Sequence, residues 1–557
     1  MIARAIVAAL VFLIALLTYP GALAVSLATR FTPAPAASPG PDGALPWLHV
    51  AHPPGDMPYI ADDQGRMVLL HGSIPASLLE FGPGTGNAYS IDPSEYADGR
   101  CPPNSPSSRY PPLCQSDLAA MSALGFNSVR LPISWSLLEP QRGRFNTTYL
   151  DRVAQLVDWA GALHMYVIVD MHQNAYSHFV AAGTDVDLGT NSGAPGWATI
   201  TDGLPSRVYQ RQRELNPAVL EATTNFWYDR DGIQDEYIAA LAFVAKRFRD
   251  QPIVAGYGVY NEPLFGWNLP PGFEDLLLFP FYRRVIDAIT GVRDGLPCWS
   301  GFFMPAVCGY RDLGVDDRRH LLFLEPGLLR QVTDFPTHLG LPISSYPNLV
   351  LTLHAYTHVF TIEQLLGQKP RTATYPWGGF DQTYGFAKRE AQAMAAALFV
   401  SEFGNSPADD DLLLTAQVRE QELHLTGFAQ WPWKENGAGW GMYKPPNSPR
   451  DSSGCLRISR ERLLARVYPR ATSDPHLTFR YDSATGAFTL TAAGRAGDAP
   501  TIVSVPAEDR GPIASSGSGT TSVEAGVEGS RTISTIPTGG NFTVSIGPGT
   551  LDLKGCP

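Results

Sequence analysis

The chain has 557 residues, with 41 Lys and Arg against 53 Asp and Glu, which gives a formal net charge of −12. Hydrophobic residues make up 44% and charged residues 17%, so the chain can bury a large core and is not intrinsically disordered. An acidic chain without a long Lys or Arg run is not expected to bind nucleic acid, because basic side chains supply the affinity for phosphates. The length predicts two or three domains, or one large domain with an appendage.

The N-terminal segment has the pattern of a secretory signal peptide. Arg4 precedes an apolar run from Ala5 to Leu17, and the small-x-small triplet Ala22-Leu23-Ala24 follows. We therefore expect residues 1–24 to be a signal peptide and the protein to be secreted; an uncleaved membrane anchor is the alternative. Residues 25–46 are rich in Pro and Ala and show no periodicity, which is typical of a linker.

Eight short apolar segments then alternate with longer segments whose apolar residues recur at helical spacing. Strands that are apolar throughout are typical of a parallel sheet buried on both faces. Eight of them separated by helices predict a (β/α)8 TIM barrel, an α/β fold. We expect this catalytic domain to span residues 47–470, with insertions at 81–116 and 176–232. The expected strands are 67–72, 127–132, 166–172, 256–262, 321–326, 349–356, 397–404 and 428–433.

The pattern changes after residue 470. Apolar and polar residues alternate around the turn-like sequence Asp482-Ser483-Ala484-Thr485-Gly486, which is typical of a β-hairpin. Further short segments of the same kind follow. We expect residues 471–557 to form a small C-terminal antiparallel β-sandwich.

Six cysteines agree with an exported protein, because disulfides persist in oxidising compartments. Many connectivities are open to six cysteines. We expect Cys101–Cys114 and Cys298–Cys308 because the partners are close in the chain, and Cys455–Cys556 as the remaining pair. No C-x2-C pair occurs, so a zinc site is not expected.

Polar residues recur where the expected strands end. In a TIM barrel the C-terminal ends of the strands line the active site, so these residues together predict a catalytic centre. For any one of them a structural ion pair is the alternative, since a buried charge needs a partner. The residues are Arg130, His172, Asn261, Glu262, Glu325, His354, Tyr356, Glu402, Trp431 and Trp433.

Two carboxylates among them suit glycoside hydrolysis, which needs one acid to protonate the leaving oxygen and a second group to meet the oxocarbenium-like carbon. Glu262 beside Asn261 is expected to be the acid/base, held protonated by burial. Glu402 is expected to stay ionised through donors such as Arg130 and Tyr356. A separation of about 5–5.5 Å between the carboxyl groups would indicate a retaining double displacement. Two carboxylates and a water suffice for this chemistry, so we expect no metal and no cofactor.

The ordered motifs identify a resemblance. Arg130-Leu131-Pro132, Asp170-Met171-His172-Gln173, Asn261-Glu262-Pro263, His354-Ala355-Tyr356 and Ser401-Glu402-Phe403-Gly404 resemble glycoside hydrolase family 5, and most nearly its endoglycoceramidase (endoglycosylceramidase) subgroup. The resemblance runs from about Met67 to the C-terminus. It implies a retaining enzyme that cuts the β-glycosidic bond between sugar and ceramide, with Glu262 as acid/base and Glu402 as nucleophile.

The same resemblance implies that His172, Asn261, Tyr356 and Trp433 hold the sugar beside the scissile bond, and Arg130 and His354 complete the expected substrate site. One position departs from the family pattern, because Asn174 stands where the family usually has Asp. An amide gives a weaker hydrogen bond to a sugar hydroxyl than a carboxylate does, so the head-group preference stays open. Two alternatives also stay open: another family-5 β-glycosidase, such as a steryl β-glucosidase or a β-glycanase, and a non-catalytic glycolipid-binding protein.

Aromatic and apolar residues on the expected catalytic face allow two interpretations. The segment Leu276–Tyr282 is either a groove for ceramide or the buried start of a helix, and we expect the helix. We expect the partner to be a glycosphingolipid or another β-glycoside, with contact to a membrane surface, and the protein to be a monomer. Five tryptophans could either stack on a sugar or pack in the core: Trp267, Trp377, Trp431, Trp433 and Trp440.

Overall fold

The computed structural model describes residues 45–556 except for 81–90, 104–108, 181–190, 208–212, 269–271, 294–297, 299–306, 310, 335, 341, 357–372, 375–377, 437–438, 445–453 and 527–528. The expected signal peptide, nearly all of the expected linker, and Trp377 lie outside the described residues. None of the helices within those bounds combines the length and apolar character that a membrane crossing requires.

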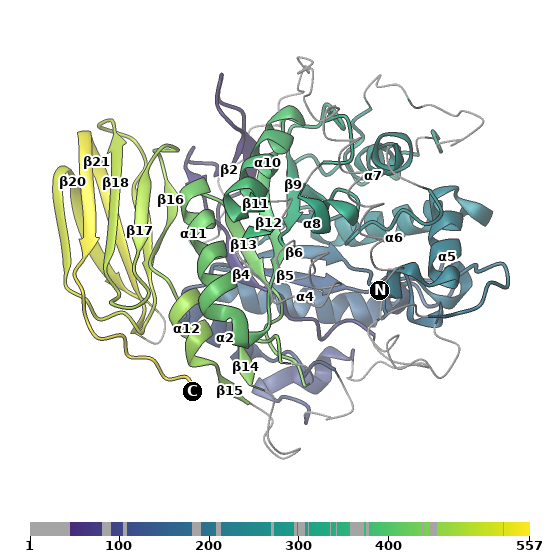
Figure 1. The fold of residues 1–557 in the computed structure, drawn as a ribbon, viewed down its shortest axis with the longest axis horizontal. Coiled ribbons are helices and arrows are strands. Elements are labelled where there is room, and N and C mark those ends of the chain that lie inside the picture. The colour runs from purple at the N-terminus through teal and green to yellow at the C-terminus, as the bar shows by residue number, and fades with distance from the viewer. Residues whose placement is uncertain are drawn as a thin grey trace.

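Eight parallel strands close into a barrel in the order β12-β13-β4-β5-β6-β7-β8-β9, so the predicted TIM barrel is confirmed (Figure 1). Each expected strand supplies one of the eight. The first differs in extent, because Met67–Val68 (β3) pairs in another sheet and only the residues after Leu70 enter the barrel. The barrel strands are β4 His71–Ser73, β5 Ser128–Ile133, β6 Tyr166–Met171, β7 Val254–Gly258, β8 Leu321–Leu324, β9 Leu349–His354, β12 Ala397–Phe403 and β13 Gly427–Gln430.

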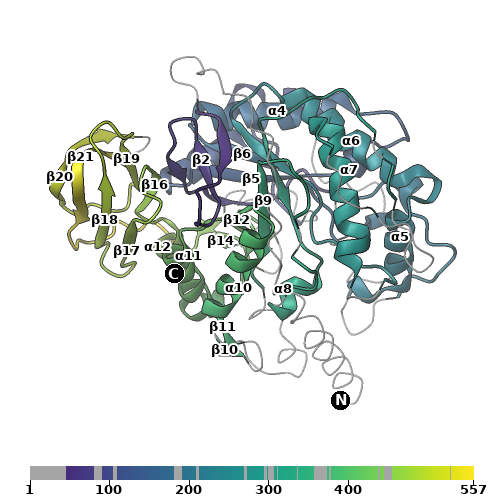
Figure 2. The same cartoon turned by 90° about the horizontal axis from the view of Figure 1, so that it is seen from above.

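Helices cover the outside of the barrel (Figure 2). One of them, α4 Thr147–Ala162, starts after Asn146, whose side chain accepts the backbone N–H of Tyr149 and so caps the helix. Its buried face packs into the same apolar cluster as the outward side chains of β5 and β6. The described α-helices are α2 Gln115–Ala123, α3 Trp135–Leu138, α4 Thr147–Ala162, α5 Pro217–Trp227, α6 Ile233–Phe248, α7 Phe279–Thr290, α8 Leu329–Thr333, α10 Phe380–Ala393, α11 Thr415–His424 and α12 Ile458–Leu464.

Shorter elements occur mainly in the loops. Turns of 3-10 helix lie at Pro93–Gly99, His178–Val180, Gly196–Ala198, Arg213–Leu215, Arg230–Gly232 and Pro407–Asp409, and π-helical turns lie at Glu274–Leu278 and Asp410–Leu414. Two-stranded ribbons join β10 Ala373–Thr374 to β11 Gly378–Gly379 and β14 Tyr443–Lys444 to β15 Cys455–Leu456.

The apolar segment Leu276–Tyr282 forms a helix start. The π-helical turn Glu274–Leu278 continues directly into α7. Leu277, Leu278 and Phe281 are at most 3% exposed and belong to the main core. The expectation of a buried helix is therefore confirmed, and this segment offers no open groove.

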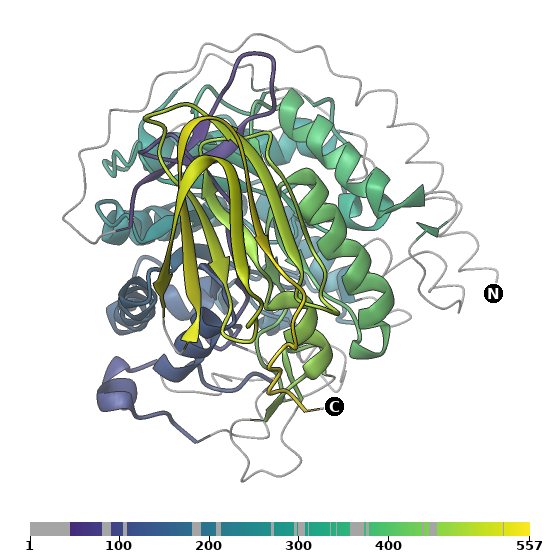
Figure 3. The ribbon, with the colours of Figure 1, turned by 90° about the vertical axis from the view of Figure 1, so that its left-hand side faces the viewer.

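The C-terminal region is an antiparallel sheet built around the long hairpin of β20 and β21 (Figure 3). One edge of β21 pairs with β20, and its other edge pairs first with β19 and then with β18. Where its partner changes from β19 to β18, Gly539 and Gly540 have φ angles of 108° and 119°, which let the strand bend. The strands are β16 Tyr468–Thr472, β17 Thr478–Tyr481, β18 Phe488–Gly494, β19 Thr501–Val505, β20 Ile513–Ala525 and β21 Arg531–Ile546.

This sheet extends beyond the expected bounds of 471–557. Strand β16 begins at Tyr468 and pairs with β3. In the same sheet β3 pairs with β2 Tyr59–Asp62, and β2 pairs with β1 Leu48–Ala51. The ring of Tyr468 also stacks on His71 of β4, with ring centroids 3.7 Å apart. N-terminal and C-terminal segments thus share one sheet. This sheet contacts the barrel at His71, where the barrel strand β4 begins.

Three disulfides are present, and they are the expected pairs Cys101–Cys114, Cys298–Cys308 and Cys455–Cys556. The last one holds the C-terminus against α12. Glu461 of that helix accepts the backbone N–H groups of Lys554 and Gly555.

Candidate active site

Alternation along the strands brings the predicted polar residues into one place. On β5, β6, β8 and β9, one set of side chains packs outward into the helix-facing core. The alternate set points into the barrel, because successive side chains of a strand face opposite sides. Near the C-terminal strand ends this inward set is Arg130, Asp170, His172, Glu325 and His354.

Glu402 reaches the same place only because β12 is irregular. Leu398 and Val400 pack outward while Ala397 and Phe399 pack inward, so simple alternation would turn Glu402 outward. Between Phe399 and Glu402, however, β12 carries one more residue than β9 opposite it, and the register is also shifted against β13. Such a bulge turns the side chains that follow it, and here it directs Glu402 inward.

Both carboxylate oxygens of Glu402 accept hydrogen bonds. Arg130 Nη1 donates to Oε2 at 2.8 Å, and the Tyr356 hydroxyl donates to Oε1 at 2.8 Å. The side chain is 8% exposed. Both donors expected for this residue are therefore in place, and one of them is a cation, which is an arrangement suited to a carboxylate.

Arg130 connects this carboxylate to the neighbouring strands. Its Nη2 donates to Asn261 Oδ1 at 2.6 Å and lies 3.0 Å from Asp170 Oδ2. The same Asp170 oxygen lies 2.9 Å from His172 Nδ1. Burial acts to raise the pKa of Asp170, but Arg130 and His172 outweigh it and hold that pKa below its ordinary value. Asp170 is thus a site residue that our strand-end criterion missed, although it stands in one of the quoted motifs.

Asp170 also requires a glycine beside it. A Cβ at Gly258 of β7 would lie 2.1 Å from Asp170 Oδ1. No side chain fits at that distance, so the glycine lets the carboxylate approach the adjacent strand.

Glu262 lies past the end of β7 in irregular backbone. Its φ is +44°, a left-handed conformation that is uncommon for residues other than glycine. Gln173 holds this turn, because its Nε2 donates to the carbonyl oxygens of Asn261 at 2.6 Å and Glu262 at 2.8 Å. Asn261 Nδ2 donates in return to the Gln173 carbonyl at 2.9 Å. Gln173 is a second residue that the strand-end criterion missed.

The Glu262 side chain points toward Glu402 and His354. It is 19% exposed, and its Oε1 lies 3.0 Å from His354 Nδ1. Burial raises the pKa of Glu262 above its ordinary value, with Arg213 and His172 opposing the shift. Burial lowers the pKa of His354 to about 3, so this imidazole is neutral at physiological pH.

The two carboxyl groups are neighbours. Glu262, Glu402 and His354 each bring one ligand-type atom within 4.8 Å of the others. The distance between the two carboxyl groups is therefore closer to the roughly 5–5.5 Å of retaining glycosidases than to the ~6.5–9.5 Å of inverting ones. The same three atoms could hold a cation, but Arg130 and Tyr356 already occupy both oxygens of Glu402. The absence of a metal remains a prediction.

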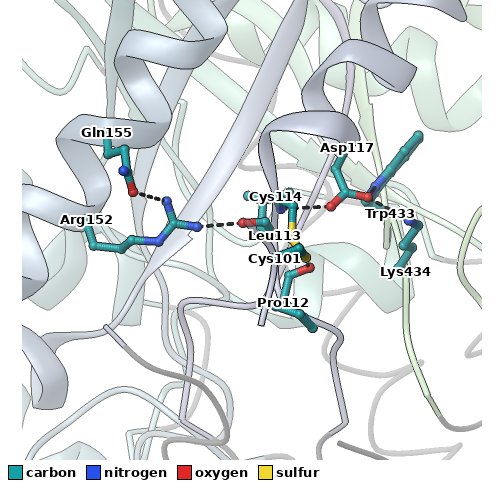
Figure 4. The surroundings of a disulfide bond; sticks show 9 residues. All are labelled: Cys101, Pro112, Leu113, Cys114, Asp117, Arg152, Gln155, Trp433 and Lys434. Carbon is teal, nitrogen blue, oxygen red and sulfur yellow. Dashed lines mark hydrogen bonds and ion pairs between the residues drawn. A yellow bond between two sulfur atoms is a disulfide. The ribbon is translucent and has the colours of Figure 1, made fainter. Parts of the chain in front are cut away.

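The aromatic ring beside the site is Trp431 rather than Trp433. Trp431, half-buried, stacks parallel to His172 with centroids 5.8 Å apart and an interplanar angle of 2°. Trp433 is 1% exposed, and its indole N–H donates to Asp117 Oδ1 at 3.0 Å (Figure 4). Lys434 donates to the same oxygen. The expectation that Trp433 holds the sugar is therefore wrong, because its ring is enclosed in the core near α2.

Asn174 leaves one polar atom unused. Its backbone pairs with Ser192, but its buried Oδ1 has no hydrogen-bond partner in the described part of the chain. Of the other tryptophans considered, Trp440 lies beside Tyr356 with centroids 6.3 Å apart, and Trp267 is 50% exposed.

Replacing Trp431 by Ala is expected to lower kcat/KM for a β-glycoside by roughly 30- to 150-fold, since loss of a central aromatic contact costs about 2–3 kcal/mol. The matched variant Trp433→Phe removes the bond to Asp117 and part of a buried core ring. It should lower the melting temperature while kcat/KM stays within about threefold of the parent. Equal kinetic losses in the two variants would refute the assignment of Trp431.

The raised pKa of Glu262 predicts the alkaline limb of the pH profile. An acid must carry its proton when substrate arrives, so activity is present below this pKa and is lost as pH rises through it. We expect kcat/KM for an alkyl β-glycoside to fall with a midpoint above the ordinary Glu value of about 4.3. A dinitrophenyl glycoside, whose leaving group needs no proton, should show a weaker fall. An identical alkaline limb for both substrates would contradict this origin.

Comparisons with known proteins agree with this geometry. The model of the Cellulase family (glycosyl hydrolase family 5) matches residues 105–444. Endoglycoceramidase I of Rhodococcus hoagii (strain 103S) is 26% identical over 472 residues, which cover 81% of this chain and 79% of that protein. Endoglycoceramidase of Cyanea nozakii is 27% identical over 400 residues, covering 67% and 71% of the two chains. The crystal structure of endogalactoceramidase superimposes with a TM-score of 0.68 at 26% identity, covering 90% of this chain and all of that one. Since the family model spans more than half of the sequence, the chain belongs to glycosyl hydrolase family 5.

Proposed function

We propose that this enzyme is a retaining endoglycoceramidase, which hydrolyses the β-glycosidic bond between a sugar and ceramide. The observation that carries the chemistry is the pair Glu262 and Glu402, whose oxygens approach within 4.8 Å in the mouth of the barrel. The observation that favours ceramide is the likeness to endoglycoceramidases over most of the chain length. A non-catalytic binding protein would have no need for both carboxylates.

In the first step Glu402 attacks the anomeric carbon while Glu262 gives its proton to the glycosidic oxygen. The bond to the lipid alcohol breaks, and the sugar becomes an ester of Glu402. Arg130 and Tyr356 orient the nucleophile through the hydrogen bonds that they donate to its two oxygens. Burial raises the pKa of Glu262, which favours the protonated form that this step needs.

In the second step Glu262, now ionised, takes a proton from a water that attacks the same carbon. The ester bond to Glu402 breaks, and two inversions give net retention. The buried His172 and the ring of Trp431 stacked on it provide a flat wall beside the reacting sugar. Asn174 remains an expected sugar contact, and its Oδ1 is buried without a hydrogen-bond partner among the described residues.

A lipid leaving group fits the distribution of exposed apolar side chains. Among the described residues, the segments between β6 and β9 carry five of them, and four of these lie in loops that directly follow β6 or β7, which in a TIM barrel lie on the catalytic face. Such residues rimming a site are typical of a surface that meets lipid. We therefore infer contact of this sector with a membrane or micelle. The five side chains and their exposed fractions are Phe179 45%, Leu204 37%, Leu215 40%, Trp267 50% and Leu339 50%.

The test of the function is product analysis. Incubation with mixed glycosphingolipids should release intact sugar head groups together with ceramide, as seen by mass spectrometry. Proton NMR of the first-formed sugar should show the β-anomer. Cleavage of only soluble β-glucans, or only of steryl glucosides, would replace ceramide with another aglycone, and release of the α-anomer would contradict double displacement.

The lipid-facing sector makes a further prediction. The triple variant Phe179→Ser, Leu215→Ser, Trp267→Ser should lower kcat/KM for glycosphingolipid in micelles by roughly 10- to 100-fold, because buried apolar area is lost. Its loss on a soluble aryl β-glycoside should stay below about threefold. Leu423, Val523 and Ile536 are also exposed but lie outside these loops. The matched triple Leu423→Ser, Val523→Ser, Ile536→Ser should therefore keep both activities. If both triples lose lipid activity alike, the sector is not a lipid contact.

The N-terminal pattern supports export, and three disulfides agree with an oxidising compartment. We propose that the enzyme acts outside the cell as a monomer. N-terminal sequencing of secreted protein and light scattering of the purified enzyme test these two points.

A further inference from the structure

A third carboxyl group, Glu325, touches the acid/base from two directions. It follows β8 and is 4% exposed. Its Oε2 accepts the backbone N–H of Glu262 at 3.1 Å. Its Oε1 lies 3.1 Å from His354 Nε2, and the other nitrogen of that ring lies 3.0 Å from Glu262 Oε1. Glu325 thus contacts the backbone of Glu262 directly and its carboxyl group through one imidazole.

One proton lies either on Glu325 or on His354 Nε2. Gln331 Nε2 donates to Glu325 Oε1 at 3.0 Å, and Oε2 is used by Glu262. His354 Nε2 has no partner that meets hydrogen-bond geometry within the described residues, and its one recorded polar contact there is Glu325 Oε1 at 3.1 Å. Either Nε2 carries the proton and Glu325 is ionised, or Nε2 is a bare acceptor and Glu325 is protonated.

The two states differ in what they do to Glu262. If Nε2 carries the proton, Nδ1 is an acceptor and Glu262 must turn its own proton toward the ring, away from the leaving group. If Glu325 is protonated, Nδ1–H donates to Glu262 Oε1, and the other oxygen of Glu262 is left to carry the proton to substrate. Only the second state also suits the ionised Glu262 of the second step, which accepts the same N–H.

We propose that Glu325 is a protonated positioning residue, whose O–H donates to His354 Nε2 and so fixes the imidazole with its proton on Nδ1, facing the acid/base. This inference rests on the proposed function and assigns a role to a group that does not itself touch substrate. No proton is consumed by it. The proton of Glu262 goes to the leaving oxygen and is regained from the attacking water, while the protons of His354 and Glu325 stay where they are.

The electrostatics of the pocket agree with this state. Burial raises the pKa of Glu325 well above its ordinary value, against the opposing Arg130, and the nearby carboxyl groups of Glu262 and Glu402 raise it further. Burial lowers the pKa of His354 to about 3, so the ring is neutral and one of its nitrogens is bare. The groups that act on the Glu325–His354 pair from the surrounding elements are Arg130, Asp170, His172, Glu262, Tyr282 and Glu402.

The kinetic test compares an amide with an apolar side chain at this position. Glu325→Gln keeps a carbonyl for the Glu262 N–H and an N–H for His354 Nε2, the two contacts that the protonated acid makes to the acid/base, and loses only the hydrogen bond accepted from Gln331. Its kcat/KM for an alkyl β-glycoside should stay within about tenfold of the parent. Glu325→Leu has neither group and should lose on the order of 100-fold on the alkyl glycoside but under about fivefold on a dinitrophenyl glycoside, which needs no acid. A Gln variant as impaired as the Leu variant would show that an ionised carboxylate is required, and the proposal would be wrong.

A second measurement does not depend on activity. Nitrogen-15 NMR of histidine-labelled protein near neutral pH should show His354 protonated on Nδ1 and bare on Nε2 in the parent and in Glu325→Gln. Infrared difference spectra of these two proteins should contain the carbonyl band of a protonated carboxyl group in the parent only. A proton on Nε2 in the parent would overturn the proposal even if the enzyme cleaves glycosphingolipid. Absence of all glycosidase activity together with the expected tautomer would instead refute the proposed function alone.

Discussion

Replacing Glu402 by Gln is expected to lower kcat/KM on every β-glycoside by on the order of 10⁵-fold, because loss of a nucleophile removes the covalent route. The amide cannot attack the anomeric carbon, and its NH₂ group would face one of the two donors, Arg130 or Tyr356. A 2-deoxy-2-fluoro glycoside with a good leaving group should label the parent enzyme, and peptide mass spectrometry should place the sugar on Glu402.

The control is Glu524→Gln on the exposed surface of β20, which should match the parent in activity. Circular dichroism and the melting temperature of Glu402→Gln should show a folded protein. If the folded variant keeps more than about 1% of the parent activity, far above what a lost nucleophile allows, Glu402 is not the nucleophile.

Replacing Glu262 by Ala is expected to lower kcat/KM on alkyl glycosides by roughly 10³- to 10⁴-fold, since acid/base assistance is lost in both steps. A dinitrophenyl glycoside needs no proton to leave, so it should still load the enzyme, and the glycosyl ester should accumulate because no base activates the water. Azide, which needs no base, should restore turnover and give the β-glycosyl azide.

The matched experiment uses Glu402→Ala with azide. A small anion that takes the place of the missing nucleophile attacks directly, so this variant should give the α-glycosyl azide. The two products separate the roles of the two carboxylates. The same anomer from both variants would contradict the assignment of Glu262 as acid/base and Glu402 as nucleophile.

Much of the barrel follows from local patterns. Short, unbroken apolar runs that alternate with helical patterns are typical of strands buried on both faces, and all eight expected runs joined the barrel. Period-2 alternation also carries Arg130, His172 and His354 to the inner face once their strands are recognised. These predictions succeed because each depends on the nearest few residues and on burial, both of which are visible in the chain.

The errors and omissions have a common cause. Trp431 and Trp433 both follow β13, and local alternation does not show which of the two rings faces the site. Asp117, which is distant in sequence, binds the Trp433 indole and holds that ring in the core. Asp170 was overlooked because it precedes the last residue of β6, and its role is recognisable only when Arg130 and Gly258 are seen against it. The bounds of the C-terminal sheet were too narrow because β16 pairs with β3, some 400 residues earlier in the chain.

The amino-acid sequence by itself determined the TIM barrel, the family motifs and the two carboxylates, since these are written in short-range periodicity and residue type. Only the tertiary structure decided how those carboxylates meet. The extra residue in β12 turns Glu402 inward against its alternation, and contacts of Gln173 and Glu325 from neighbouring strands hold Glu262 in a left-handed turn. Such geometry depends on which strands lie side by side, and a linear pattern of side chains does not contain the distances between them.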